Sequence, residues 1–347
     1  MLAAVYHGVG DIQLEEVPTP AIGADEILMR VRAGSICGTD LRIYSSGHFK
    51  IPPGTPRILG HELAGEVAEA GSLVRGYKPG MRITVAPNFG CGTCDQCIQG
   101  NTHLCPHYEA LGITVDGAFA EYARIPAAAI HQGNVVPIPE GVSFEVAALN
   151  EPFSCCYNGS RACRIEPGDV VLIVGAGPIG IMHLLLARLS GARAVIVSET
   201  MEERLSQARE FGPDFLLNPT VEDLPTLVRE VSGGHGADAI VIAAPSPEAQ
   251  EQALDLAATH GRINFFGGLP KGREFIRFNS NRVHYKGISV LGTTGSNNYQ
   301  FRRTLEILAA RKIDLNPLIS ARFPLSRIQE GFSMAASKKA LKVVINA

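Results

Sequence analysis

The 347-residue sequence has no surplus of basic residues. It contains 31 lysines and arginines against 34 aspartates and glutamates, which gives a formal net charge of −3. Proteins that bind nucleic acid usually carry a basic surface for the phosphate backbone, so we expect no nucleic-acid partner. Hydrophobic residues make up 46% of the chain and charged residues 19%, a composition that excludes a disordered or fibrous protein.

The sequence also lacks a long uninterrupted apolar segment. Residues 170–187 are uncharged, but three glycines and a proline interrupt them. We therefore expect a strand, a turn and a helix there, and no membrane partner. No basic segment precedes an apolar one near Met1, so we expect no signal peptide and a cytoplasmic, reducing location.

The pattern of predicted elements changes near residue 150. Before it, short segments such as 26–33 and 119–125 are separated by prolines and glycines, which indicates a β-rich domain. After it, apolar runs alternate with helical segments such as 247–259, which indicates a doubly wound parallel sheet. Because single cores stop growing at about 250–300 residues, we expect two domains.

A glycine-rich segment follows the first of these buried strands. Gly175, Gly177 and Gly180 have the G-x-G-x-x-G spacing of a dinucleotide-binding loop. The first glycine allows a tight turn, the second lets the backbone approach a pyrophosphate, and the third lets helix and strand pack closely. The helix N-terminus then offers free N–H groups to the phosphates. We predict that these glycines bind the cofactor together with Pro178 and Ile179.

A carboxylate stands where the second buried strand ends. Glu199 has the spacing from Gly180 that is expected of the residue that binds the ribose hydroxyls. Because a carboxylate repels a 2′-phosphate, we predict NAD in preference to NADP. Arg204 could stack on the adenine, could allow NADP to bind, or could be a solvated arginine paired with a neighbouring glutamate. Phe266 and Thr293 are further predicted cofactor contacts.

Four of the eight cysteines fall in one short segment: Cys91, Cys94, Cys97 and Cys105. Four thiolates on one loop can close tetrahedrally around Zn²⁺, and no position is then left for a substrate, so we expect a structural zinc. An iron–sulfur cluster or four buried thiols are the alternatives. Three further cysteines have no predicted chemistry beyond packing: Cys155, Cys156 and Cys163.

Two more segments carry a resemblance to a known family. Gly60-His61-Glu62, followed by glycines at 65 and 71 and a valine at 74, resembles the signature of the zinc-containing alcohol dehydrogenases. These belong to the medium-chain dehydrogenase/reductase superfamily. The Cys37-Gly38 segment stands ahead of this signature, and the cysteine lobe and the glycine-rich loop stand after it, which is the family's order. The resemblance therefore covers essentially the whole chain.

The resemblance implies the fold and the assembly. We expect a two-domain α/β protein with a GroES-like zinc catalytic domain over 1–150 and 293–347. A Rossmann domain that binds NAD would occupy 151–292. Family members are commonly dimers or tetramers, so a homodimer or homotetramer is expected.

The resemblance also implies a catalytic zinc. Cys37 and His61 would bind it, with Glu62 as the third ligand. Glu151, in the segment Glu151-Pro152, would be a fourth carboxylate at the metal or its water. The alternative for Glu62 and Glu151 is a surface or capping carboxylate.

Two residues near Cys37 would support the reaction. Asp40 would accept the second ring N–H of His61 and fix its tautomer. Thr39 would take the proton from the substrate hydroxyl. The implied reaction is the transfer of hydride from a secondary alcohol to NAD, with zinc as a Lewis acid.

The sequence resembles two groups of dehydrogenases that differ in substrate. Glu62, Glu151-Pro152 and the segment 314–319 most resemble the sorbitol (L-iditol) and related polyol dehydrogenases, although Gly295-Ser296 stands where these usually have Arg-Tyr. The segment 37–44 is also similar to threonine dehydrogenases, whose histidine before the cysteine lobe is absent here.

A polyol phosphate as the substrate and a non-catalytic role are two further alternatives. Basic residues between the metal segments could bind a polyol phosphate or could belong to a solvated loop: Arg42, His48, Lys50 and Arg57. A non-catalytic relative should have lost metal ligands, and none of the expected ligands is missing, so this alternative is disfavoured.

Overall fold

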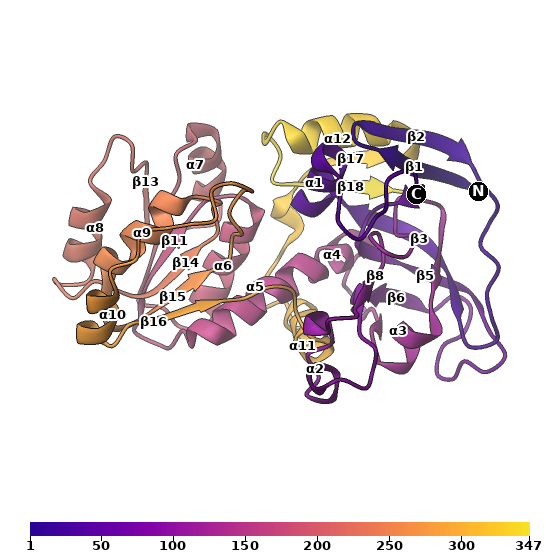
Figure 1. The fold of residues 1–347 in the computed structure, drawn as a ribbon, viewed down its shortest axis with the longest axis horizontal. Coiled ribbons are helices and arrows are strands. Elements are labelled where there is room, and N and C mark those ends of the chain that lie inside the picture. The colour runs from indigo at the N-terminus through magenta and orange to yellow at the C-terminus, as the bar shows by residue number, and fades with distance from the viewer. The chain divides into compact units, whose positions relative to one another are not determined.

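The computed structural model describes all 347 residues, which form two compact units (Figure 1). The first unit comprises Met1–Ser154 and Ser296–Ala347, and the second comprises Cys155–Gly295. The predicted domain boundary lies at residue 150, whereas the two units divide within the helix α5 (Asn150–Cys163). The chain is a two-domain α/β protein, as the sequence predicts.

The second unit is built on six parallel strands in the order β13-β12-β11-β14-β15-β16. This is the strand order of a dinucleotide-binding fold, with its switch point between β11 and β14. The run Val170–Val174 forms β11 because its aliphatic side chains are almost wholly buried between two layers of helices.

The elements of the second unit alternate regularly along the chain. They are β11 (Val170–Val174), α6 (Pro178–Leu189), β12 (Ala194–Ser198), α7 (Glu202–Arg209), β13 (Phe215–Leu217), α8 (Leu224–Val231), β14 (Ala237–Ile242), α9 (Pro247–Leu256), β15 (Ala257–Phe265), α10 (Ser280–Lys286) and β16 (Ser289–Gly292).

The predicted helix over 247–259 is shorter in the structure. Helix α9 ends at Leu256, and Ala257 is extended with φ −72° and ψ 140°. Ala257 begins β15 and pairs in parallel with Ala237 of β14. Strand pairing therefore outweighs the helical propensity of this alanine-rich segment.

The first unit contains a seven-stranded sheet with β3 at its centre. The strand β5 pairs antiparallel with one side of β3, and β9 and the C-terminal strand β18 pair with it on the other side. In the register of β18, Val344 lies opposite Ser35. The end of β3, the start of β5 and the start of β18 therefore meet, although they are far apart in the sequence.

Twelve short strands and seven helices make up this unit. The strands are β1 (Leu2–Gly8), β2 (Asp11–Glu16), β3 (Ile27–Ser35), β4 (Arg57–Ile58), β5 (Glu62–Ala70), β6 (Arg82–Val85), β7 (Asn88–Phe89), β8 (Glu109–Ala110), β9 (Tyr122–Ile125), β10 (Val135–Pro137), β17 (Ile319–Pro324) and β18 (Lys342–Asn346). The α-helices are α1 (Gly38–Ser46), α2 (Asp95–Ile98), α3 (Ala127–His131), α4 (Phe144–Ala148), the start of α5, α11 (Asn298–Ala309) and α12 (Ile328–Ala336). None of the helices in the chain combines the length and the apolarity that crossing a bilayer requires.

Candidate active site

Asp40 joins the two segments that carry the predicted metal ligands. Its Oδ2 accepts the backbone N–H of Cys37 at 2.8 Å, and its Oδ1 accepts the backbone N–H of Gly60 at 3.3 Å. The first contact caps α1 at its N-terminus, where a carboxylate also meets the positive end of the helix dipole. Asp40 is fully buried, so both hydrogen bonds are shielded from water.

Gly60 is required by the backbone that leads into β5. Its φ is +95°, and a Cβ at this position would lie 3.0 Å from the ring of Phe119. Both the left-handed conformation and the close packing favour glycine. The turn at Gly60 thereby orients the side chain of His61, the next residue.

His61 lies beside Asp40, with its Nδ1 3.4 Å from Oδ1 of the carboxylate. The side chain is buried. Burial lowers the pKa of His61, but the negative charges of Asp40 and Cys37 outweigh this effect and hold its pKa well above the usual range. Nδ1 has no hydrogen-bond partner, so the contact with Asp40 is an ion-pair contact and not a hydrogen bond.

The structure brings three of the four predicted ligands together. The sulfur of Cys37, a ring nitrogen of His61 and a carboxylate oxygen of Glu62 all lie within 4.8 Å of one another. All three groups are ligands that zinc accepts. Oε1 of Glu62 is buried and has no hydrogen-bond partner, as expected of an oxygen that binds a cation. These donors therefore fit a divalent metal.

Glu151 lies outside this three-residue group. It is buried, in the first turn of α5. It is therefore not a surface carboxylate, whereas its place in the first turn is compatible with the capping carboxylate of the alternative interpretation. Thr39 is half-buried in the first turn of α1, two residues after Cys37.

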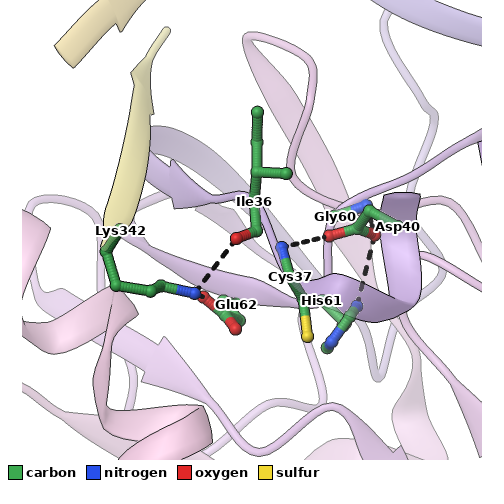
Figure 2. Close-up of polar contacts among 7 residues, drawn as sticks. All are labelled: Ile36, Cys37, Asp40, Gly60, His61, Glu62 and Lys342. Atoms are coloured by element: carbon green, nitrogen blue, oxygen red, sulfur yellow. Dashed lines mark hydrogen bonds and ion pairs between the residues drawn. The ribbon is translucent and has the colours of Figure 1, made fainter. Parts of the chain in front are cut away.

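Lys342, at the start of β18, is a site residue that the sequence did not predict. Its Nζ lies 2.5 Å from Oε2 of Glu62 and 3.1 Å from the carbonyl oxygen of Ile36, and Figure 2 shows both contacts. Lysine is rarely buried unless it is paired, and this side chain is only 4% exposed. Its contact with Glu62 spans 280 residues, so the only signal in the sequence is a lysine within the apolar run 341–345.

The four-cysteine lobe also forms a compact group. The four sulfur atoms lie within 4.8 Å of one another. Cys105 is buried, and its sulfur accepts the backbone N–H groups of Cys91 and His107, both at 3.3 Å. Such N–H donors stabilise thiolates, and all eight cysteines are free of disulfides. The lobe therefore fits a second, closed zinc site.

The glycine-rich loop of the second unit has the geometry of a dinucleotide site. Gly175 has φ +105°, and a Cβ on Gly180 would lie 1.8 Å from the carbonyl oxygen of Gly175. Gly177 caps α6, which begins at Pro178 and continues through Ile179. The N-terminus of this helix is free of a side-chain cap, so its N–H groups are available to phosphates.

Glu199 is bound to the same loop. Its Oε2 accepts the N–H of Ala176 at 2.9 Å, and its Oε1 accepts those of Thr200 and Met201 at 2.7 and 3.0 Å. The guanidinium of Arg204 lies 3.9 Å from Oε2. Arg204 therefore faces the predicted ribose carboxylate and is not paired with the neighbouring glutamates.

A cavity of about 240 Å³ opens beside Glu199 at the carboxyl ends of β11, β12 and β14. Its walls are mostly aliphatic, and Gly175 and Glu199 contribute to its rim. An adenine ring beside a ribose matches this combination of apolar wall and carboxylate. Phe266 and Thr293 follow the ends of β15 and β16, and neither lines this cavity.

The predicted basic cluster is partly engaged within the chain. Lys50 donates to the carbonyl oxygen of Tyr108 at 2.6 Å and lies over its ring, and Arg57 pairs with Asp116 at 2.9 Å. Nδ1 of His48 accepts the backbone N–H of Lys50 at 3.2 Å, so three of the four basic side chains already have partners. This favours the solvated-loop interpretation over a phosphate site.

Fold and site together describe an oxidoreductase that uses zinc and a nicotinamide dinucleotide. Two family patterns match the chain: "Alcohol dehydrogenase GroES-like domain" over residues 23–140 and "Zinc-binding dehydrogenase" over 178–310. Among its relatives, an L-threonine 3-dehydrogenase of Pyrococcus furiosus is 36% identical, with 96% of this chain and 94% of the relative covered. A sorbitol dehydrogenase of Halalkalibacterium halodurans is 30% identical, with 99% and 98% covered.

Solved structures support the same assignment. A zinc-binding dehydrogenase from Sinorhizobium meliloti bound to NADP is 33% identical and has a TM-score of 0.90, with 100% of this chain and 99% of that chain covered. The chain belongs to the zinc-dependent medium-chain dehydrogenase/reductase family. It is an NAD(P)-dependent alcohol-type dehydrogenase with a GroES-like and a Rossmann domain, as its sequence predicts.

Proposed function

We propose that the protein oxidises a secondary alcohol of a polyol such as sorbitol or iditol, with NAD as the hydride acceptor. The observation that carries this proposal is the group formed by Cys37, His61 and Glu62, whose donor atoms lie within 4.8 Å of one another. One sulfur, one imidazole and one carboxylate make a harder ligand set than one rich in thiolates. Such a set suits a substrate with several oxygen atoms.

The three clustered residues would hold the zinc, with Glu151 as an additional carboxylate near the metal or its water. Bound zinc supplies Lewis-acid chemistry, which lowers the pKa of a coordinated substrate hydroxyl. Asp40, 3.4 Å from Nδ1 of His61, would orient the ring from that side. Thr39 follows Cys37 by two residues, and its hydroxyl would accept the proton of the substrate hydroxyl.

The second unit would bind NAD through its glycine-rich loop. The nicotinamide supplies the redox chemistry, and the protein aligns it with the substrate carbon. Glu199 is buried at the end of β12 beside the 240 Å³ cavity, where its charge would oppose the 2′-phosphate of NADP. Arg204 lies 3.9 Å from Glu199 and offsets part of that charge, so we expect a preference for NAD rather than an absolute selection.

L-threonine is the second candidate substrate. The relative from Pyrococcus furiosus, an L-threonine 3-dehydrogenase, is 36% identical over 96% of this chain, against 30% for the sorbitol dehydrogenase. Pro87-Asn88-Phe89 stands where the threonine enzymes carry a histidine before the cysteine lobe, which favours the polyol. Lys50 and Arg57 have partners, so we do not favour a polyol phosphate.

The deciding experiment is a comparison of initial rates of NAD reduction. Sorbitol, iditol, xylitol and L-threonine are assayed with the zinc-loaded protein over a range of concentrations. We expect the highest kcat/KM with one of the polyols. A kcat/KM for L-threonine that exceeds the best polyol by about tenfold, or about 1.4 kcal/mol in transition-state stabilisation, rejects the polyol and supports the second candidate.

The variant Cys37→Ser tests the metal ligand in the same assay. We expect kcat to fall by about 10³-fold or more, because the Lewis acid contributes several kcal/mol. Thermal unfolding should change little, since Cys37 is a loop residue at the start of α1. Retained turnover in Cys37→Ser would show that this cysteine does not hold the catalytic metal.

A further inference from the structure

The carboxylate of Glu62 has two unlike oxygens. Oε2 accepts a hydrogen bond from Nζ of Lys342 at 2.5 Å, whereas Oε1 is buried without a partner. Glu62 itself is fully buried. An isolated buried carboxylate is costly, so the pairing of one oxygen stabilises its charge while the other stays available.

Lys342 is fixed by the backbone as well as by Glu62. Its Nζ also donates to the carbonyl oxygen of Ile36 at 3.1 Å, immediately before Cys37. The N–H of Ile36 in turn donates to the carbonyl of Val343 at 2.9 Å. The ammonium therefore bridges the end of β3 and the start of β5, the two strands from which the clustered ligands emerge (Figure 2).

The surroundings keep this ammonium charged. Burial lowers the pKa of Lys342, but the charges of Glu62 and Cys37 outweigh it, and the pKa is raised above its usual value. Asp40 adds a further negative charge nearby. A fixed positive charge thus stands directly behind one oxygen of a proposed metal ligand.

We propose that Lys342 is a positioning residue of the metal centre, which retains Oε2 of Glu62 so that Oε1 alone faces the cation. The inference rests on the proposed function, because it takes Glu62 as a ligand. Lys342 has two effects. It limits Glu62 to one donor oxygen, and it offsets the charge of that carboxylate, so that more of the metal's charge remains for the substrate oxygen.

The test replaces the lysine and measures the metal directly. In Lys342→Met the ammonium is lost and the side chain keeps a similar length. We expect the catalytic site to bind Co²⁺ about tenfold more tightly or better, because a cation next to a cation site has been removed. We also expect weaker visible d–d bands of the bound cobalt, since Glu62 can then use both oxygens and raise the coordination number. The readouts are chelator competition and the absorption spectrum.

Two variants serve as matched comparisons. Lys342→Arg retains the charge and the donors, and we expect it to restore both the affinity and the spectrum towards those of the parent protein. Lys312→Met removes an exposed lysine and should leave both unchanged. If Lys342→Met does not fold, Lys342→Gln removes the charge with a smaller change in polarity, and the same gain in affinity is expected.

Three results would overturn the proposal. One is weaker cobalt binding in the neutral variants, which would assign Lys342 a structural role only. Another is unchanged affinity and spectrum. A third is a loss of NAD affinity with the metal site unaltered, which would make the lysine a cofactor contact. Failure of the proposed function gives different results. A wrong substrate shows in the comparison of initial rates and leaves cobalt binding unchanged, and a wrong ligand set shows as cobalt binding that Cys37→Ser does not change.

Discussion

His61 is the residue whose protonation and metal binding compete most directly. The charges of Asp40 and Cys37 hold its pKa well above the usual range despite burial. Without metal, the raised pKa favours the protonated imidazole beside Asp40. Zinc must displace that proton, so zinc binding releases a proton and weakens as the pH falls.

We predict a pH dependence for the chelated protein. The pKa of His61 in the folded state lies above its unfolded value of about 6.5, so the protonated pair contributes its full stability below that pH. The contribution is lost as the pH rises through the raised pKa. Thermal unfolding of chelated parent protein and Asp40→Asn checks this. The Tm difference between them should be largest in acid and shrink as the pH rises, and a constant difference would contradict the assignment.

Glu199 makes two kinds of contact: it lines the 240 Å³ cavity, and its carboxylate anchors the glycine-rich loop through Ala176. In Glu199→Ala the loop loses its anchor, so the binding of both NAD and NADP should weaken. The binding of NAD should weaken further, because the contact with its ribose is also lost. A hydrogen bond to a charged group contributes about 1.5–3 kcal/mol, so the NAD/NADP ratio of kcat/KM should fall about tenfold or more. An unchanged ratio would mean that Glu199 serves the loop alone.

At the scale of elements, the cysteine lobe has little regular structure of its own. It contains α2, with four residues, and a 3-10 turn at Thr102–Leu104. Such short elements bury too few side chains to be stable alone, so bound metal should supply most of the order.

We therefore predict that Cys94→Ser lowers stability more than chemistry. The lobe should lose its zinc, and total zinc should fall from about two per chain to about one. Thermal unfolding should shift down by several degrees, with kcat per remaining catalytic zinc little changed. Zinc analysis by mass spectrometry together with calorimetry measures both. If this variant still held about two zinc ions per chain, the prediction that the four cysteines of the lobe bind zinc would be wrong.

Local patterns in the sequence predict the parts of the fold and site that depend on neighbours in the chain. The run Val170–Val174 and the glycines after it are such a case, since a strand, a turn and a helix start follow from adjacent residues. Lys342 could not be predicted, because its pairing with Glu62 depends on the register of β18 against β3. The predicted helix end at residue 259 was wrong for the same reason, since pairing with β14 ends the helix at Leu256.

At the scale of the whole molecule, the two kinds of site belong to different units. The clustered metal donors Cys37, His61 and Glu62 lie in the first unit, and the loop Gly175–Gly180 with Glu199 lies in the second. Each unit has its own buried apolar core. Zinc and the dinucleotide would therefore be held by structures that do not share residues.

This separation predicts that removal of the catalytic metal abolishes turnover while the protein still binds NAD. The loop and the cavity beside Glu199 do not include any metal-binding residue, so the Kd for NAD should change by less than about threefold, or about 0.7 kcal/mol. Because the chain has no tryptophan, titration calorimetry is the suitable measurement. The protein is chelated under conditions that spare the zinc of the cysteine lobe, and re-addition of zinc should restore activity. Loss of NAD binding with the catalytic metal would instead require that the metal site organises the cofactor site.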